Sequence, residues 1–151
     1  MRLTTHADYC LRVLMFVALK QDELSTIAEI SDAFGVSRNH LRKVVHRLSC
    51  KGYLWTIRGK NGGFRLARHA SKIRVGQVVR DAEEDTVLVE CFNTSTSQCK
   101  IEGCCVLQQT LRKAISAFYH ELDKCTLAAL ARPKARLSKA LGLEMPVYLV
   151  K

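Results

Sequence analysis

The stretch TIAEISDAFGVSRNHLRKVVHRL, residues 26–48, decides the fold. Its first part predicts a short helix, because Thr26 followed by Glu29 is the start signal of a capping box. Gly35 is expected to end that helix, since glycine readily adopts the left-handed backbone of a helix C-terminus. Ser37 can cap a second helix, with apolar residues on one side and basic residues on the others. A helix, a glycine-containing turn and a basic helix predict a helix-turn-helix.

The segments on either side of this stretch complete the predicted domain. Residues 53–57 and 64–66 are β-rich and flank the turn at residues 61–63, so they predict a hairpin of the kind called a wing. Residues 5–20 carry apolar residues at helical spacing, and Thr5 with Asp8 forms another start signal. We therefore predict a mainly α fold with a small β-hairpin wing, in which residues 1–85 form a winged helix-turn-helix DNA-binding domain.

The second helix and the wing supply candidate DNA contacts. In a helix-turn-helix, the N-terminal residues of the second helix reach the base edges. Arginine reads guanine and asparagine reads adenine through paired hydrogen bonds, whereas basic residues further along contact phosphates. Taken alone, the basic helix could be an ordinary solvated face and the wing glycines an ordinary tight turn. Their order along the chain, taken together, favours DNA binding. The predicted DNA-binding residues are Ser37, Arg38, Asn39, His40, Arg42, Lys43, Arg58, Lys60, Asn61, Gly62 and Gly63.

Composition points to the same class of partner. The 151 residues carry a formal net charge of +10, which favours a polyanion such as double-stranded DNA. The longest apolar run, residues 13–19, is too short to cross a bilayer, and no secretory signal is visible, so we expect a cytoplasmic protein without a membrane partner. The sequence contains no nucleophile and base pair and no nucleotide-binding motif, so we do not expect an enzyme.

Four of the seven cysteines are grouped in residues 86–105, which we predict to be a cluster-binding loop. Seven residues separate Cys91 from Cys99, and five separate Cys99 from Cys105. This uneven spacing without histidine is not typical of structural zinc and fits an iron–sulfur cluster. Cys105 begins a predicted helix, whose N-terminus favours negative charge. Cys104 is a bystander or a redox thiol, and a regulatory disulfide or free thiols remain alternatives for the group.

The remainder of the chain is predicted from one long apolar stripe. Residues 106–131 carry apolar side chains at helical spacing, which indicates either packing against the first helix or a dimerisation helix. We favour dimerisation, because a DNA-reading winged helix usually needs two half-sites. Residues 132–151 form a basic C-terminal tail.

Several motifs together resemble the family of iron–sulfur winged-helix repressors that includes NsrR, IscR and RirA. They are residues 1–4 with Asp8 and Tyr9, residues 35–41, residues 58–66, and the cysteines at 91, 99 and 105. The match looks closest to the nitric-oxide-sensing NsrR members. The resemblance implies a homodimer whose long helices cross and which holds a 4Fe-4S cluster, with 2Fe-2S as the alternative. It also implies that nitrosylation of the cluster by nitric oxide releases operator DNA.

The resemblance also bears on the fourth ligand. IscR-like proteins have a histidine three residues beyond the third cysteine, where this chain has Gln108. NsrR-like proteins use a carboxylate near the N-terminus of the other subunit, and Asp8 stands at that position. Asp8 could instead only complete the capping box begun by Thr5. The long spacing from Cys91 to Cys99 approaches the RirA pattern, so an iron-responsive repressor is the first alternative. A cluster-free thiol switch, in which Cys104 or Cys105 oxidises with Cys99, is the second.

Overall fold

The computed structural model describes residues 3–21, 23–83, 87–93, 97–102 and 104–143. The predicted boundary between residues 85 and 86, and residues 144–151 of the predicted tail, lie outside the described residues. In chain order the elements are α1 (Thr5–Lys20), α2 (Ile27–Phe34), α3 (Arg38–Cys50), β1 (Leu54–Ile57), β2 (Gly63–Leu66), η1 (Ala70–Lys72), α4 (Val75–Ala82), η2 (Glu90–Phe92), α5 (Val106–Asp123), α6 (Leu127–Leu130) and α7 (Lys134–Ala140).

The helix-turn-helix forms as its local signals predict. The Thr26 hydroxyl accepts the backbone N–H of Glu29 at 3.3 Å, and the Glu29 carboxylate accepts the backbone N–H of Thr26 at 2.7 Å, so the capping box is complete. Gly35 ends α2 with a φ of 64°, in the left-handed region that glycine tolerates. Ser37 caps α3 by accepting the N–H of His40 at 3.4 Å. The predicted mainly α fold with a winged helix-turn-helix is confirmed.

The start of α1 corrects one prediction. The capping residue is Thr4, whose hydroxyl accepts the N–H of Ala7 at 3.1 Å, and Thr5 already belongs to the helix. The predicted capping box of Thr5 and Asp8 is therefore wrong. The Asp8 carboxylate instead pairs with Arg12, one helical turn further on, at 2.9 Å.

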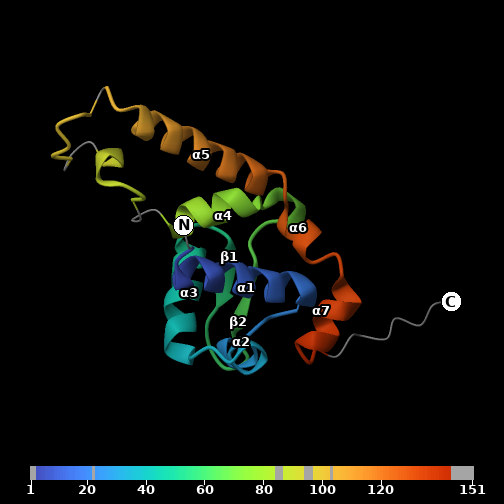
Figure 1. The fold of residues 1–151 in the computed structure, drawn as a ribbon. Coiled ribbons are helices and arrows are strands. Elements are labelled where there is room, and N and C mark those ends of the chain that lie inside the picture. Colours follow the sequence, from blue (N-terminus) through green and yellow to red (C-terminus); the bar gives the residue numbers. More distant parts are fainter. Residues whose placement is uncertain (1–2, 22, 84–86, 94–96, 103, 144–151) are drawn as a thin grey trace.

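The hydrophobic core is built around α1, which crosses the middle of the molecule between α3 and α4 (Figure 1). Side chains from α1 to α4 and from both strands meet there, and Leu127 of α6 joins them. Because α1 contacts α3, α4, α6 and β2, its buried face is wider than a single stripe. The fully buried members on α1 include Val13, Leu14, Phe16 and Val17.

The wing is a two-stranded antiparallel hairpin in which Leu54 pairs with Leu66 and Ile57 with Gly63. Ser25 adds a further bridge, because its N–H and C=O bond the backbone of Phe64 at 2.8 and 2.9 Å. The connecting loop spans residues 58–62, so Gly63 belongs to β2 rather than to the turn. This pairing fixes the hairpin to the segment that precedes α2.

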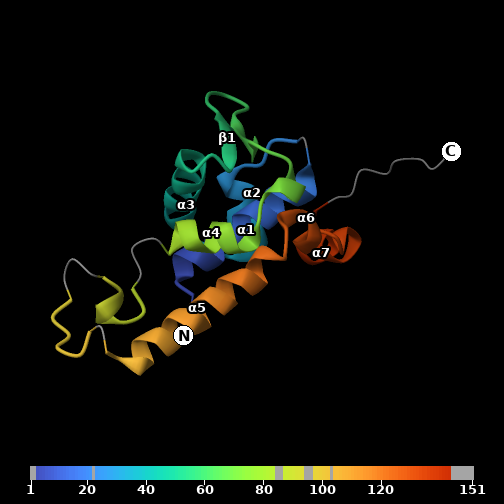
Figure 2. The ribbon, with the colours of Figure 1, turned by 90° about the horizontal axis from the view of Figure 1, so that it is seen from above.

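Helix α5 packs by its C-terminal part on α4, while its N-terminal part and the cysteine loop extend beyond the body of the molecule (Figures 1 and 2). None of its residues is fully buried. The predicted segment 106–131 is divided, because α5 ends at Asp123 and the separate helix α6 follows. Helix α7 lies within the predicted basic tail. None of the helices among the described residues is long and apolar enough to cross a membrane.

Gly76 makes the close contact between α4 and α5 possible. A Cβ atom at this position would collide with the Asp123 carboxylate and would lie 2.9 Å from the backbone oxygen of Tyr119. Arg80, one turn along α4, donates to both carboxylate oxygens of Asp123 at 2.8 and 2.9 Å. Its guanidinium also lies 5.1 Å from the centre of the Tyr119 ring. These contacts fix the end of α5 on α4.

We expect Gly76→Ala to lower the free energy of unfolding by about 1–3 kcal/mol, the usual cost of an overpacked contact. A loss of stability would be informative, because alanine in a helix normally raises the free energy of unfolding by up to about 1 kcal/mol relative to glycine. Urea unfolding followed by circular dichroism measures the change. Gln77→Ala, at an exposed neighbouring position on α4, is the control and should stay within about 0.5 kcal/mol of the parent. A stabilised Gly76→Ala variant would contradict the close contact.

Candidate DNA interface and cysteine loop

The first turn of α3 is held at the surface by the residues that follow it. The apolar side chains of α3 are buried in the core, whereas those of its first turn and of Arg42 and Lys43 are exposed. The buried set is Leu41, Val44, Val45 and Leu48. This division turns the predicted base-reading residues Ser37, Arg38, Asn39 and His40 outward together.

The exposed side chains of α3 make few contacts with one another. Arg42 donates to the Asn39 side-chain oxygen at 2.8 Å, which orients that amide in the free protein. Arg38 lies 4.0 Å from the carboxylate of Asp32, and both side chains are more than half exposed. An exposed pair at this distance is weak, so the Arg38 guanidinium is available to a partner. The His40 ring stands 6.3 Å from that of Tyr9 in α1.

The wing loop presents further basic side chains on a tightly folded backbone. Arg58, Lys60 and Asn61 are exposed, and Asn61 has a φ of 69°. A side chain at Gly62 would collide with the backbone oxygen of Ile57 and approach that of Gly59 to 2.9 Å. Gly62 therefore has a structural role that is independent of any contact with DNA.

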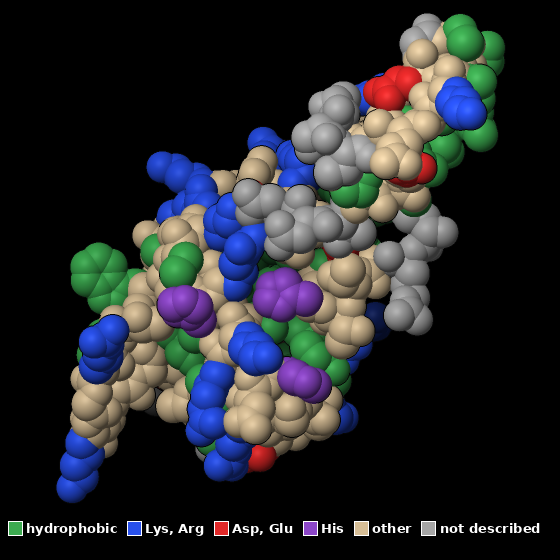
Figure 3. Space-filling view, turned by 90° about the vertical axis from the view of Figure 1, so that its left-hand side faces the viewer, with side chains coloured by type: hydrophobic (Ala, Val, Ile, Leu, Met, Phe, Trp, Pro, Cys, Tyr) green, Lys and Arg blue, Asp and Glu red, His purple; other side chains and the backbone are tan. Residues whose placement is uncertain are grey.

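Basic side chains gather on the face of the molecule that Figure 3 shows, and acidic ones are rare there. This view looks onto the side at which α3 lies in Figure 1. A face rich in lysine and arginine, with a helix N-terminus and a hairpin exposed beside it, has the charge and shape that DNA backbones and grooves require.

The cysteine loop is joined to the start of α5. Cys105 caps this helix, and its sulfur accepts the backbone N–H of Gln108 at 3.3 Å. The Gln108 side chain donates to the backbone oxygen of Cys91 in η2 at 3.1 Å. Arg112, one turn further along α5, lies 4.7 Å from the centre of the Phe92 ring. These contacts hold η2 against the first turns of α5.

The neighbouring thiols differ in their surroundings. Cys91, Cys99 and Cys105 are half-buried, whereas Cys104 is exposed and its thiol donates to the backbone oxygen of Ile101 at 3.4 Å. Among the described contacts of these four thiols, that of Cys105 is the one in which the sulfur accepts a backbone N–H at a helix start. Cys105 and Cys104 therefore differ in exposure and in hydrogen bonding.

The donor set fits a thiolate-bound iron–sulfur cluster. The three half-buried cysteines are unpaired thiols, and thiolates are the ligands that such clusters use. Within the described parts of the chain, no three His, Cys, Asp or Glu side chains stand close enough to hold a metal ion. Asp8 lies on the first turn of α1, and its only described ion pair is with Arg12. The structure thus places three candidate ligands on one loop and the fourth on another element.

The other cysteines lie apart from this loop. Cys10 is buried in the core beside α3 and α4, and burial raises the pKa of its thiol to about 12. Cys50 is exposed near His46, and Cys125 is half-buried after α5. The high pKa keeps Cys10 protonated, so it packs in the core as a small apolar residue.

Sequence reasoning missed two contacts near the site. Gln108 lacks the imidazole of IscR-like proteins, but it lies three residues after Cys105, where a helix cap finds its N–H partner. The Glu83 carboxylate accepts the backbone N–H of Thr4 at 2.6 Å and so fixes the start of α1 against the end of α4. No local signal relates residues this far apart in the chain.

Comparisons with known proteins place the chain among regulators. A family model, Rrf2, described as an iron-dependent transcriptional regulator, matches residues 3–133. The HTH-type transcriptional regulator NsrR of Oceanobacillus iheyensis is 43% identical over 145 residues, which cover 95% of this chain and 99% of that protein. NsrR of Bacillus subtilis is 42% identical over 145 residues, which again cover 95% of this chain and 99% of the relative.

Solved structures share the fold at lower identity. IscR of T. potens superposes with a TM-score of 0.71 at 22% identity, covering 88% of each chain. CymR of B. subtilis, described as the global cysteine regulator, gives a TM-score of 0.70 at 23% identity, covering 88% of this chain and 98% of that one. At these sequence identities the comparison shows a shared fold, that is, the same arrangement of helices and wing.

Proposed function

Since this chain belongs to the Rrf2 family of transcriptional regulators, we propose that it is a repressor that binds operator DNA as a homodimer and responds to nitric oxide through an iron–sulfur cluster. The observation that carries the proposal is the half-buried Cys105 thiol at the start of α5, tied through Gln108 to Cys91. It occurs in a chain that is 43% identical over nearly its whole length to a regulator named NsrR.

In this proposal α3 reads the operator and the wing contacts its backbone. Arg38 and Asn39 lie exposed on the first turn of α3, where side chains of a recognition helix meet base edges. Lys60, at the exposed wing loop, supplies a phosphate contact and hence affinity for any sequence. In a homodimer, the α3 helix and wing of each subunit would bind one of two half-sites.

The cluster would be held by Cys91, Cys99 and Cys105, with Asp8 of the partner subunit as the fourth ligand. We propose the 4Fe-4S type, with 2Fe-2S as the alternative. When bound, the cluster supplies iron that reacts with nitric oxide. The chain's own part is to place Cys105 at the helix start, tied to Cys91 through Gln108, and to connect Asp8 of α1 with α3, against which α1 packs. A change in how Asp8 is held would therefore reach the reading helix.

The exposed N-terminal part of α5 supports the homodimer. Val106 and Leu107 are 74% and 64% exposed, and the apolar residues further along are at most half-buried. A helix with an apolar stripe but no buried residue needs a partner surface. A second copy of α5 presents the same stripe, as a two-fold interface requires.

Asp8→Ala should weaken retention of the cluster by at least roughly tenfold, the loss caused when even an outer-shell partner of a metal ligand is removed. The rate of iron loss to a chelator under anaerobic conditions measures this. Arg12→Ala is the matched control, because it breaks the ion pair but keeps the carboxylate. Both variants should fold normally, since an exposed i,i+4 pair contributes only about 0.3–0.5 kcal/mol. Equal iron loss from parent and Asp8→Ala would exclude Asp8 as a ligand.

The signal is tested by titrating anaerobically purified protein with nitric oxide while operator binding is followed by fluorescence anisotropy. We expect stoichiometric iron and a loss of operator affinity upon nitric oxide addition. Loss of affinity upon iron removal, without a response to nitric oxide, would support the iron-responsive alternative. A colourless protein whose DNA binding depends on peroxide would support the thiol switch.

A further inference from the structure

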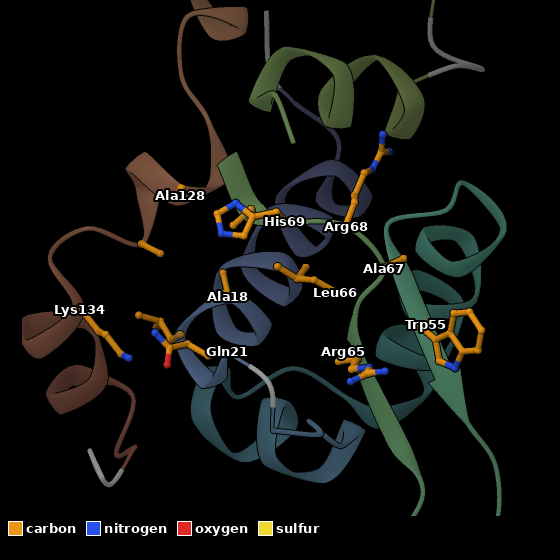
Figure 4. Close-up of a pocket in the computed structure, with 13 residues that line it drawn as sticks. Ala18, Gln21, Trp55, Arg65, Leu66, Ala67, Arg68, His69, Ala128 and Lys134 are labelled. Atoms are coloured by element: carbon orange, nitrogen blue, oxygen red, sulfur yellow. The ribbon is translucent and has the colours of Figure 1, made fainter. Parts of the chain in front are cut away.

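A cavity of about 680 Å³ lies between the wing and the C-terminal helices (Figure 4). It is bordered by β2 and the residues that follow it, by the end of α1, and by α6 and the start of α7. Helix α3 lies on the other side of the wing (Figure 1). The cavity is therefore separate from both the cysteine loop and the predicted base-reading residues, and its volume is within the range of about 300–1,000 Å³ typical of small-molecule sites.

The cavity is positively charged. Arg65, Arg68, His69 and Lys134 line it, and none of its described lining residues is acidic. The Arg68 guanidinium lies 4.5 Å from the centre of the Tyr53 ring and is engaged there. The side chains of Arg65 and Lys134 form no ion pair or hydrogen bond with any described residue. The charged groups of Arg65 and Lys134 can therefore both bind an anionic group of a ligand.

Apart from Gln21, the rest of the lining is apolar and leaves space. Five of the lining residues are alanines, whose side chains are short. At one end of the cavity stands Trp55, with its side chain 61% exposed (Figure 4). Trp55 is the register partner of Arg65 across the hairpin, so an aromatic face and a guanidinium occur side by side.

We propose that this cavity binds a small aromatic carboxylate. Its ring would lie against Trp55 and the alanine-lined wall, because aromatic rings gain from offset stacking as well as from burial. Its carboxylate would be bound by Arg65, whose planar guanidinium matches that group with two hydrogen bonds, or by Lys134 as a point charge. The ligand would connect β2 of the wing to α7 and so act on the wing independently of the cysteine loop.

Titration of the full-length, nitrogen-15-labelled chain with 2-naphthoate tests the proposal. Trp55 is the only tryptophan, so its indole N–H gives a single cross-peak that reports on the cavity. We expect a saturable shift of this cross-peak, and affinity at least roughly tenfold lower for the neutral isostere 2-naphthamide, because a charge-assisted hydrogen bond is lost. Lys134→Gln and Arg65→Gln should each weaken 2-naphthoate binding severalfold, whereas Lys139→Gln, on α7 but outside the lining, should bind like the parent.

Three results would overturn the proposal. One is the absence of a saturable shift with 2-naphthoate, and another is equal affinity for 2-naphthamide. The third is a shift of the indole cross-peak caused by operator duplex alone, together with displacement of 2-naphthoate by that duplex. This result would show that Arg65 and Lys134 bind the DNA backbone. The proposed repressor function does not depend on the outcome, because it rests on α3 and the cysteine loop.

Discussion

Replacing Cys105 with alanine should leave the chain without an iron–sulfur cluster and lower its operator affinity by roughly 10³-fold, towards the level of nonspecific binding. Cys105 is the proposed ligand at the start of α5, and its sulfur accepts the Gln108 N–H. Of the proposed ligands, only Cys91, Cys99 and Asp8 of the partner subunit would remain, too few to retain the cluster. Iron and acid-labile sulfide per chain, together with anisotropy on an operator duplex, measure both effects.

Two controls separate ligation from folding. Cys104→Ala removes the exposed neighbouring thiol and should keep both the cluster and operator binding, because that thiol is bonded to the backbone of Ile101. Cys105→Ser keeps a hydrogen-bond acceptor at the helix cap but replaces the soft sulfur ligand, so it should be helical and cluster-free. A Cys105→Ala protein that still contains a full complement of iron would show that another residue ligates the cluster.

Arg38→Ala should cost about 1–3 kcal/mol of binding free energy on the operator and much less on random duplex. The Arg38 guanidinium is exposed at the start of α3, and its distance of 4.0 Å from Asp32 leaves it free to bond a guanine edge. Anisotropy titrations on operator and random duplexes at the same salt concentration measure this difference.

Lys60→Ala is the matched comparison, because Lys60 stands on the exposed wing loop as a phosphate contact. It should weaken binding to both duplexes alike and reduce the slope of log affinity against log salt by roughly 1. If Arg38→Ala lost equal affinity on both duplexes, Arg38 would be a phosphate contact and the assignment of base reading to it would fail.

The helix-turn-helix could be predicted because its signals act over three or four residues. The Thr26 capping box, the Gly35 stop and the Ser37 cap each depend on atoms within one turn of the chain. The wing was predictable for the same reason, although its five-residue loop, 58–62, is longer than the predicted turn. Local geometry of this kind depends mainly on neighbours in sequence, so it can be predicted where no distant contact favours an alternative.

The errors arose where distant contacts decide between local alternatives. Thr4 and Thr5 are both plausible caps, but Glu83 accepts the Thr4 N–H and so favours the earlier start. The apolar stripe of α5 continues past Asp123, yet the helix stops there. The backbone groups that would continue the helix bond the segment before α4 instead. The Cys125 carbonyl accepts the Val75 N–H at 3.0 Å, and the Leu127 N–H donates to the Ile73 carbonyl at 2.9 Å.

The candidate metal site could be predicted only in part. The three cysteines are visible as a group, and the cap at Cys105 follows from its place before an apolar helical stripe. The contact from Gln108 to Cys91 joins residues seventeen positions apart and has no sequence signal. The proposed role of Asp8 involves a second subunit, so neither the sequence nor the contacts within one chain can place it.

The attachment of α5 by one end has a mechanical consequence. Its C-terminal turns are fixed to α4 through Gly76 and the Arg80 pair with Asp123, while the cysteine loop is carried at the far end of its 18 residues. With a rise of 1.5 Å per residue, the helix is a lever arm about 27 Å long. A tilt of about 10° at the α4 contact therefore moves the far end by about 5 Å, by the same geometry. Conversely, a displacement of about 5 Å at the cysteine loop corresponds to a rotation of about 10° between α5 and the winged-helix domain on which it packs.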